Sequence, residues 1–134
     1  ISDSHFNVDL DETGESTLFI FSDSITNLEV GDEVALFDAN GIIDDQGNTG
    51  EILVGMGTWT GEQLEVTAIS GVDLSPFGGP ILPGYIAGNT MTLKVFDAST
   101  GIKYNVNYTT SDGSGSFNGL LTNIDSITLT SCFD

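Results

Sequence analysis

The residues best suited to chemistry are the acids and amides between Asp38 and Glu51. Calcium prefers several oxygen ligands from flexible loops, and this segment begins Asp-Ala-Asn-Gly and ends with a glutamate. It is not an EF-hand, because the glycine comes too early and Ile42 and Ile43 occupy ligand positions. Two alternatives stay open, an irregular calcium site or an acidic hairpin exposed to water. The candidate ligands are Asp38, Asn40, Asp44, Asp45 and Asn48.

Groups that could carry catalysis are scarce. The single histidine, His5, lies beside the first residue, where we expect an exposed strand position rather than a general base. Ser114 is flanked by glycines in a sequence typical of a hairpin loop, not of a nucleophile elbow before a helix. The acids are numerous enough for a paired-carboxylate glycosidase, but a typical cleft needs a longer chain. We therefore expect no enzymatic activity.

Carbohydrate binding would need exposed aromatic platforms, for which Trp59 and Tyr85 are the candidates. Trp59 follows an alternating run, Ile52-Val54-Met56-Thr58, with odd parity, so it should face the opposite side of that strand. One face of the strand must be core. Burial of Trp59 and its use as a platform therefore both stay open.

The elements that must position these groups are strands, because apolar and polar residues alternate with a period of two along most of the chain. Segments 91–97 and 102–108 should pair as a hairpin, as should 6–10 and 16–21. Gly55 and Gly57 leave room for another part of the chain to approach closely. No window shows a sustained helical stripe. The expected strands are 6–10, 16–21, 33–38, 51–60, 64–68, 91–97, 102–108, 116–121 and 126–130.

Eight or nine short strands separated by Gly, Asn and Asp turns predict an all-β fold. We expect one domain over residues 1–134, an antiparallel β-sandwich of jelly-roll or Ig-like type, with a closed barrel as the second choice. The segments Phe37-Asp38-Ala39 and Phe96-Asp97-Ala98 echo each other, each shortly before a glycine. In both, the aspartate is expected to accept backbone N–H bonds and set the turn.

Residues 71–89 break the strand pattern, because they contain all three prolines of the chain and five of its seventeen glycines. They are predicted to form one long loop. Long loops in small domains are often functional. The loop either caps an open end of the sandwich or contacts another copy or module. The second alternative is favoured by the absence of any acid from 74 to 96. Its contact residues would be Phe77, Ile81, Leu82 and Tyr85.

The charge of the chain excludes whole classes of function. Against 20 Asp and Glu there are two Lys and no Arg, for a net charge of −18 over 134 residues, which excludes a nucleic-acid binder. No apolar run is long enough to span a bilayer. The acids crowd residues 1–65, so divalent cations such as calcium should stabilise the fold by relieving repulsion. Cys132, the single cysteine, is a free thiol or pairs outside the chain.

Four runs carry a resemblance to a known kind of module: Gly31-Asp32-Glu33-Val34-Ala35-Leu36-Phe37-Asp38, Leu53-Val54-Gly55, Gly84-Tyr85-Ile86-Ala87-Gly88-Asn89 and Leu93-Lys94-Val95-Phe96-Asp97. From about Phe6 to Thr130 the chain resembles a recurrent β-sandwich module of large secreted or surface proteins of marine and Bacteroidetes-like bacteria. That resemblance implies adhesion, surface display or extracellular assembly and brings no catalytic residues. The cysteine frequent before Val-Gly in such modules is Leu53 here.

The sequence thus predicts a noncatalytic extracellular module with a structural or adhesive role. It would be a repeat of a surface adhesin or a subunit of a filament, with other copies or neighbouring modules as partners. A carbohydrate-binding module that takes polysaccharide is the second alternative, and a viral decoration or fibre domain is the third. The chain begins at Ile1 and contains no signal-like segment, so we expect a secreted or cell-surface protein whose signal peptide has been removed or lies outside this sequence. A mature protein and a fragment of a larger one both stay open.

Overall fold

The fold is seen in a computed structural model that describes residues 8, 10, 15–113, 115–117 and 121–133. Within these residues it contains nine strands and one short 3₁₀ helix, η1 (Ser75–Phe77). The strands are β1 (Ser16–Phe21), β2 (Glu33–Ile42), β3 (Thr49–Thr58), β4 (Leu64–Ile69), β5 (Val72–Asp73), β6 (Ile81–Leu82), β7 (Met91–Asp97), β8 (Ile102–Asp112) and β9 (Leu121–Phe133). Among the described residues, no helix is long and apolar enough to cross a membrane.

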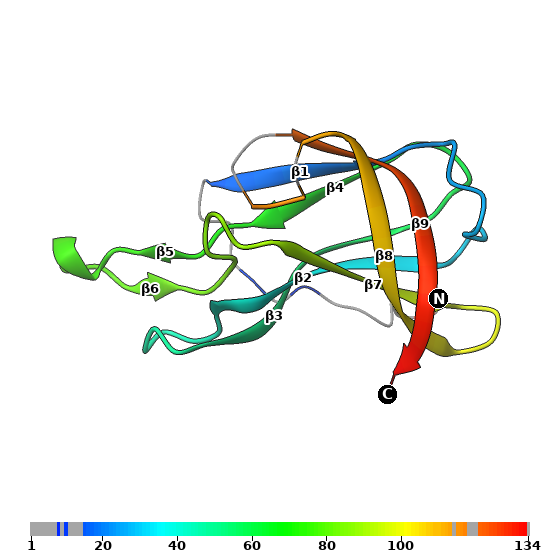
Figure 1. Ribbon diagram of the computed structural model, residues 1–134. Helices are drawn as coiled ribbons and strands as arrows, with labels where there is room; N and C mark the ends of the chain where they lie inside the picture. Colours follow the sequence, from blue (N-terminus) through cyan, green and yellow to red (C-terminus); the bar gives the residue numbers. More distant parts are fainter. Residues whose placement is uncertain (1–7, 9, 11–14, 114, 118–120, 134) are drawn as a thin grey trace.

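Seven strands form one curled sheet in the order β3-β2-β7-β8-β9-β1-β4, and β5 and β6 form a separate two-stranded ribbon (Figure 1). All neighbours in the large sheet are antiparallel except β1 and β9, which run parallel. The all-β class is confirmed. The antiparallel sandwich of eight or nine strands is not, because a single mixed sheet of seven strands curls almost into a barrel, the second choice of the sequence analysis.

The curl brings the two edge strands, β3 and β4, side by side. Gly55 makes this approach possible, because a Cβ atom there would lie 2.7 Å from the backbone oxygen of Thr67 on β4. The same atom would lie 3.2 Å from a methyl of Leu36 on the neighbouring strand. The close approach expected at Gly55 and Gly57 is confirmed. It covers two strand edges that would otherwise be exposed templates for aggregation.

Alternating residues of the strands fill the interior of the curled sheet. Phe19 packs edge-on against Phe117, with ring centroids 5.7 Å apart. Because most strands send every second side chain inward, much of the core follows from the period of two in the sequence. In β2 both faces are covered, since Glu33 to Leu36 are all buried. The fully buried members include Phe19, Phe21, Val34, Leu36, Val54, Val95, Phe117 and Ile124.

Several strands agree with the sequence and others do not. The segment 16–21 forms β1 as expected, and β7 and β8 form the predicted hairpin. At the end of the chain one continuous strand, β9, replaces the separate strands expected at 116–121 and 126–130; it curves along β8 through three irregularities in register. Ser116 forms only an isolated bridge with Thr90. The strand expected at 6–10 falls largely outside the described residues.

Candidate functional site

A two-stranded arm projects from one end of the curled sheet (Figure 1). It consists of β5, η1 and β6, with Val72 paired to Leu82 and Asp73 to Ile81. Residues 71–89 therefore contain more regular structure than the single loop that the sequence predicted. The short strands pair because Pro76 and Pro80 confine the chain reversal to the tip, where η1 supplies the turn.

The tip of the arm is held by its own hydrogen bonds. The N–H groups of Phe77 and Gly79 both donate to the carbonyl oxygen of Leu74, at 2.9 Å, and the N–H of Leu74 donates to the carbonyl of Pro80 at 3.0 Å. Asp73 accepts from the N–H of Ser75 at 2.9 Å. The hydrogen bonds from Ser75 lower the pKa of Asp73. The tip is thus ordered before any partner arrives.

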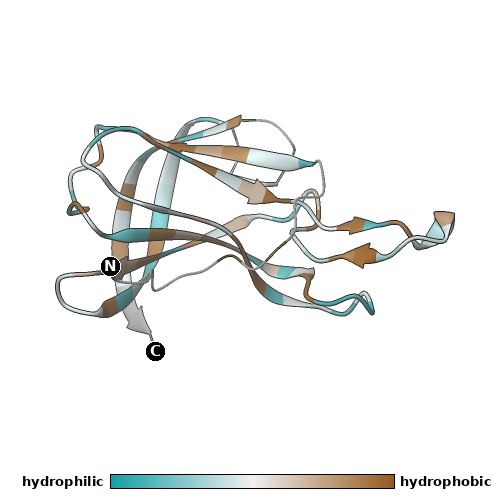
Figure 2. Cartoon of the chain, turned by 180° about the vertical axis from the view of Figure 1, so that it is seen from behind, coloured by the Kyte–Doolittle hydropathy of each residue, from teal (hydrophilic) through white to brown (hydrophobic). Residues whose placement is uncertain are grey.

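Phe77 lies at this tip, and 87% of its surface is exposed. Figure 2 shows hydrophobic colour on both strands of the arm below it. None of the buried residues of the core comes from residues 72–82. The alternative in which Phe77 caps an open end of the core is therefore contradicted, since its ring is turned to solvent.

Two contacts attach the arm to the rest of the fold. Ile42 and Gly84 exchange backbone hydrogen bonds of 2.8 and 3.0 Å, which couples the arm to the end of β2. Only glycine fits at position 84, because a Cβ there would lie 2.3 Å from the backbone nitrogen of Gly71. Tyr85 follows and stacks on Phe117 at 4.5 Å between ring centroids.

Tyr85 is 3% exposed, and its hydroxyl accepts a hydrogen bond from Thr17 at 2.9 Å. It is an anchor of the arm and not, as the sequence suggested, one of its contact residues. Ile81 and Leu82 are partly buried along the arm. A Cβ at Gly47 would lie 3.4 Å from Ile81, so the acidic β2–β3 hairpin runs along one flank of the arm.

Asp38 fastens the segment that follows the arm. It is 1% exposed, and its carboxylate accepts the N–H of Ile86 at 2.8 Å and the side-chain amide of Asn89 at 3.0 Å. It also accepts the N–H of Asn40 at 2.9 Å, which is the turn-setting role expected of it. Asp97 does the same for Ser99, and the hydrogen bonds from Ser99 lower the pKa of Asp97.

The predicted calcium ligands all lie on or beside the β2–β3 hairpin, but they engage different partners. Asp44 accepts from the backbone N–H groups of Gln46 and Asn48 and from the amide of Asn48, at 2.8–3.1 Å. The hydrogen bond from the Asn48 side chain is the main cause of the lowered pKa of Asp44. Asp45 is exposed and accepts from Gln46. Calcium binding by this set stays a prediction.

Another acidic cluster, which the sequence analysis missed, lies at the opposite end of β2. Carboxylate oxygens of Glu29, Asp32 and Asp97 lie within 4.8 Å of one another. Asp32 is buried, and its oxygens accept the N–H groups of Glu29 at 2.9 Å and Ala98 at 3.3 Å. The turn before β2 and the turn after β7 meet here. No local motif could have revealed this pairing, since it depends on the β2–β7 register.

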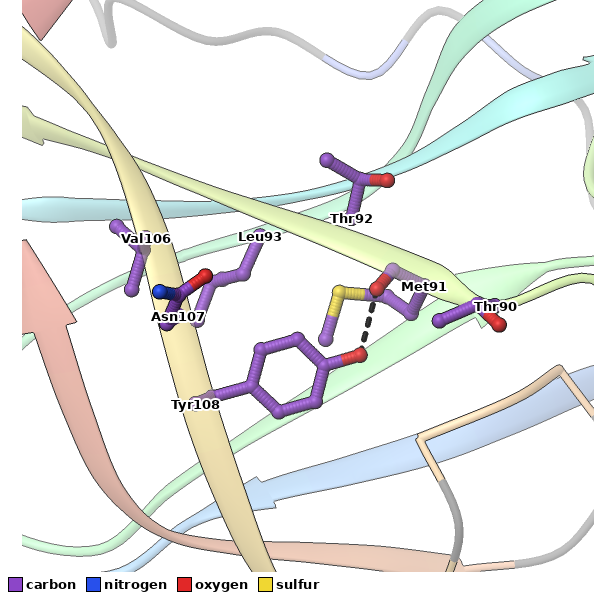
Figure 3. A pocket seen from close by; sticks show the side chains of 7 residues that line it. All are labelled: Thr90, Met91, Thr92, Leu93, Val106, Asn107 and Tyr108. Carbon is purple, nitrogen blue, oxygen red and sulfur yellow. Dashed lines mark hydrogen bonds between the residues drawn. The ribbon is translucent and has the colours of Figure 1, made fainter. Parts of the chain in front are cut away.

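A pocket of about 490 Å³ opens where β7 and β8 part. Their pairing runs from the hairpin turn to Leu93 and Val106 and goes no further. Beyond that point the ring of Tyr108 reaches across the gap, and its hydroxyl donates to the carbonyl of Met91 at 2.5 Å (Figure 3). Burial raises the pKa of Tyr108 to about 12. The pocket is lined by Thr90, Met91, Thr92, Leu93, Val106, Asn107 and Tyr108.

Trp59, the other proposed sugar platform, is 2% exposed. It lies just past β3, where its backbone donates to the carbonyl of Asp32 at 2.7 Å and accepts from Gly31 at 2.9 Å. The structure therefore decides between the two alternatives in favour of burial. His5 and Ser114 lie outside the described residues, and Cys132 lies in β9 opposite Tyr104.

Comparison with known proteins gives no match: no family model, curated protein or solved structure is similar enough to this chain to assign it to a family.

Proposed function

We propose that this protein is a noncatalytic structural module of an extracellular assembly, and that the arm joins it to another copy. The observation that carries the proposal is Phe77, an aromatic side chain 87% exposed on an ordered tip. Isolated exposed apolar residues are common, but a large one raised on a projecting arm is well placed for a partner. A rigid tip also loses little entropy on docking.

The distribution of charge favours a small contact at the tip of the arm over a broad interface between two copies. Two chains of −18 repel each other, so they can approach closely only where acids are sparse. The stretch from Leu74 to Phe96 holds none; Asp73 borders the tip, where it accepts from Ser75, and the hairpin acids lie along the arm. A saline external medium would screen the remaining repulsion. An extracellular setting is proposed on that ground.

The expected strength of this contact is modest. Fully burying a Phe side chain is worth about 1.5–3 kcal/mol. Association itself costs about 4–15 kcal/mol. Phe77 together with its neighbours on the arm therefore gives weak, concentration-dependent assembly, which becomes firm when many copies are displayed together. This behaviour suits a repeat in an adhesin or a subunit of a filament.

We also propose that a divalent cation, calcium in the first instance, binds at Glu29, Asp32 and Asp97. Three carboxylates within 4.8 Å repel one another, and a cation between them would relieve that repulsion beyond what their hydrogen bonds from Ser99 and the backbone do. Each carboxylate has about four acceptor positions, so Asp32 can serve both its backbone donors and a cation. Such a site would brace two turns at one end of the fold.

Sedimentation velocity tests the assembly. The wild type is expected to show larger species as its concentration rises from about 1 μM to about 1 mM, the range of weak affinities. Phe77→Asp should sediment as a monomer with unchanged melting, because its side chain makes no core contact. Val30→Asp is the matched control: Val30 is also exposed, at 74%, but lies off the arm, and this variant should assemble normally.

A wild type that stays monomeric over the whole range would rule out the proposed function. So would a Phe77→Asp variant that assembles as well as the wild type.

A further inference from the structure

We propose that the pocket between β7 and β8 receives Phe77 from the arm of a second copy of this chain. This inference rests on the proposed function and names the surface that the arm meets. It joins two features that the body of the fold leaves unused, an exposed aromatic tip and an uncharged pocket.

The lining of the pocket suits an aromatic ring. The lining mixes apolar and polar side chains: Met91, Leu93 and Val106 are largely buried, and the ring of Tyr108 lies among them (Figure 3). Thr90 and Asn107 are exposed at the rim. None of the seven lining residues is charged. At about 490 Å³ the pocket has room for a phenyl ring and the adjoining Pro76.

Tyr108 keeps the pocket in shape. Its hydroxyl is held by the carbonyl oxygens of Met91 and Gly115, at 2.5 and 3.3 Å. The ring therefore stays in the gap between the strands, where it forms part of the lining. Edge-to-face or offset packing of two aromatic rings is favourable beyond simple burial.

The two surfaces also match in charge. The seven lining residues carry no charge, and the acids near them are few. Asp38, opposite Met91 in the sheet, is 1% exposed, and Asp125 accepts from Thr109, next to Tyr108. Asp97 lies at the far end of β7 from Thr90 and Met91. In a chain with a net charge of −18, the uncharged tip of the arm and the uncharged lining of the pocket are surfaces that can meet with little repulsion.

The geometry requires a second copy. The arm points away from the sheet that carries the pocket, so it cannot fill the pocket of its own chain (Figure 1). Arm and pocket are different surfaces, so the contact is heterologous: each copy that joins leaves one arm and one pocket free. Such contacts build an open row of subunits or close into a ring.

Mixing two defective variants tests this arrangement. Phe77→Asp loses the arm contact and keeps the pocket, whereas Asn107→Trp fills the mouth of the pocket and keeps the arm. Trp is well tolerated at an exposed strand position. Thr90→Glu is a second pocket variant that places a charge at the rim. Thr67→Trp, on an exposed position of β4, is the matched control.

In sedimentation velocity each defective variant alone should be a monomer, and Thr67→Trp should assemble like the wild type. An equimolar mixture of Phe77→Asp and Asn107→Trp should form a one-to-one dimer and nothing larger, because it contains one intact arm and one intact pocket for each pair. The mixture of Phe77→Asp and Thr90→Glu should behave in the same way.

If both pocket variants assemble like the wild type while Phe77→Asp is monomeric, this inference is wrong and the proposed function stands. A mixture that remains monomeric overturns the inference as well. If Phe77→Asp itself assembles, the proposed function falls and the inference falls with it.

Discussion

The buried aspartates of this chain accept hydrogen bonds from backbone N–H groups. Asp32 immediately precedes β2 and Asp38 lies within it, and each accepts from a segment distant in sequence, at Ala98 and at Ile86. Buried carboxylates need such donors to offset their lost hydration. The sequence predicts only the local hydrogen bond of these aspartates, in which Asp38 and Asp97 accept the N–H of the residue two positions later in the turn.

Asp38→Asn should destabilise the protein by about 1–3 kcal/mol, the usual effect of leaving buried polar groups unsatisfied. The amide of asparagine offers one acceptor oxygen, so it cannot serve the donors from Asn40, Ile86 and Asn89 together. Urea denaturation measures the change. Asp45→Asn on the exposed hairpin is the control and should be neutral; equal effects of the two variants would show that Asp38 is not a structural clamp.

Tyr108 gives the protein an alkaline limit. Its pKa is raised from 10.0 to about 12 in the folded state by burial, so the folded protein holds this proton more tightly than the unfolded chain does. The corresponding stability is complete below pH 10 and is lost as the pH rises toward 12. Between pH 10 and about pH 12, the free energy of unfolding of Tyr108→Phe should fall by less than that of the wild type. Parallel pH profiles of the two proteins would contradict this assignment.

At the scale of elements, the curl of the sheet depends on a close approach that small residues permit. Gly55→Ala should destabilise the fold by about 1–3 kcal/mol, because the added methyl meets the backbone oxygen of Thr67 at 2.7 Å. Gly50→Ala, on the same strand, meets only the Ile43 side chain at 3.6 Å and should be neutral. Thermal melting of both variants separates steric contact from a general effect of replacing glycine. Equal melting would mean that β3 and β4 do not close on each other.

The sequence indicated most strands but neither the arm nor the closure. Alternation predicts a strand over 91–97 because Met91, Leu93 and Val95 face one core. It cannot reveal β5 and β6, which have two residues each and whose pairing depends on the turn at η1. Nor could it place Trp59, which lies past the end of β3, where strand parity no longer determines the direction of the side chain.

The long-range parts of the candidate site were likewise invisible to local patterns. Glu29, Asp32 and Asp97 meet through the pairing of β2 with β7, and the pocket exists because β7 and β8 part after Leu93. The sequence does indicate Phe77, because its segment is apolar and acid-free. It indicates Tyr85 on the same ground, but Tyr85 is buried against Phe117, because apolar character alone does not distinguish a buried anchor from an exposed contact residue.

At the scale of the whole molecule, a charge of −18 makes cations the main external influence on stability. Melting in calcium chloride should be higher than in sodium chloride of equal ionic strength. Glu29→Gln and Asp97→Asn should each reduce that difference, and Asp45→Asn should leave it intact. If Asp45→Asn reduces it instead, the cation binds on the β2–β3 hairpin; equal melting in the two salts would leave only general screening.

The central claim is that the tip of the arm meets another copy of the chain. The most direct measurement replaces Phe77 with the photoreactive amino acid benzoylphenylalanine, irradiates the concentrated protein and maps the cross-linked peptides by mass spectrometry. The account predicts covalent dimers whose cross-links join position 77 of one chain to residues 90–93 or 106–108 of another. Products confined to single chains, at concentrations where the protein sediments as larger species, would contradict it.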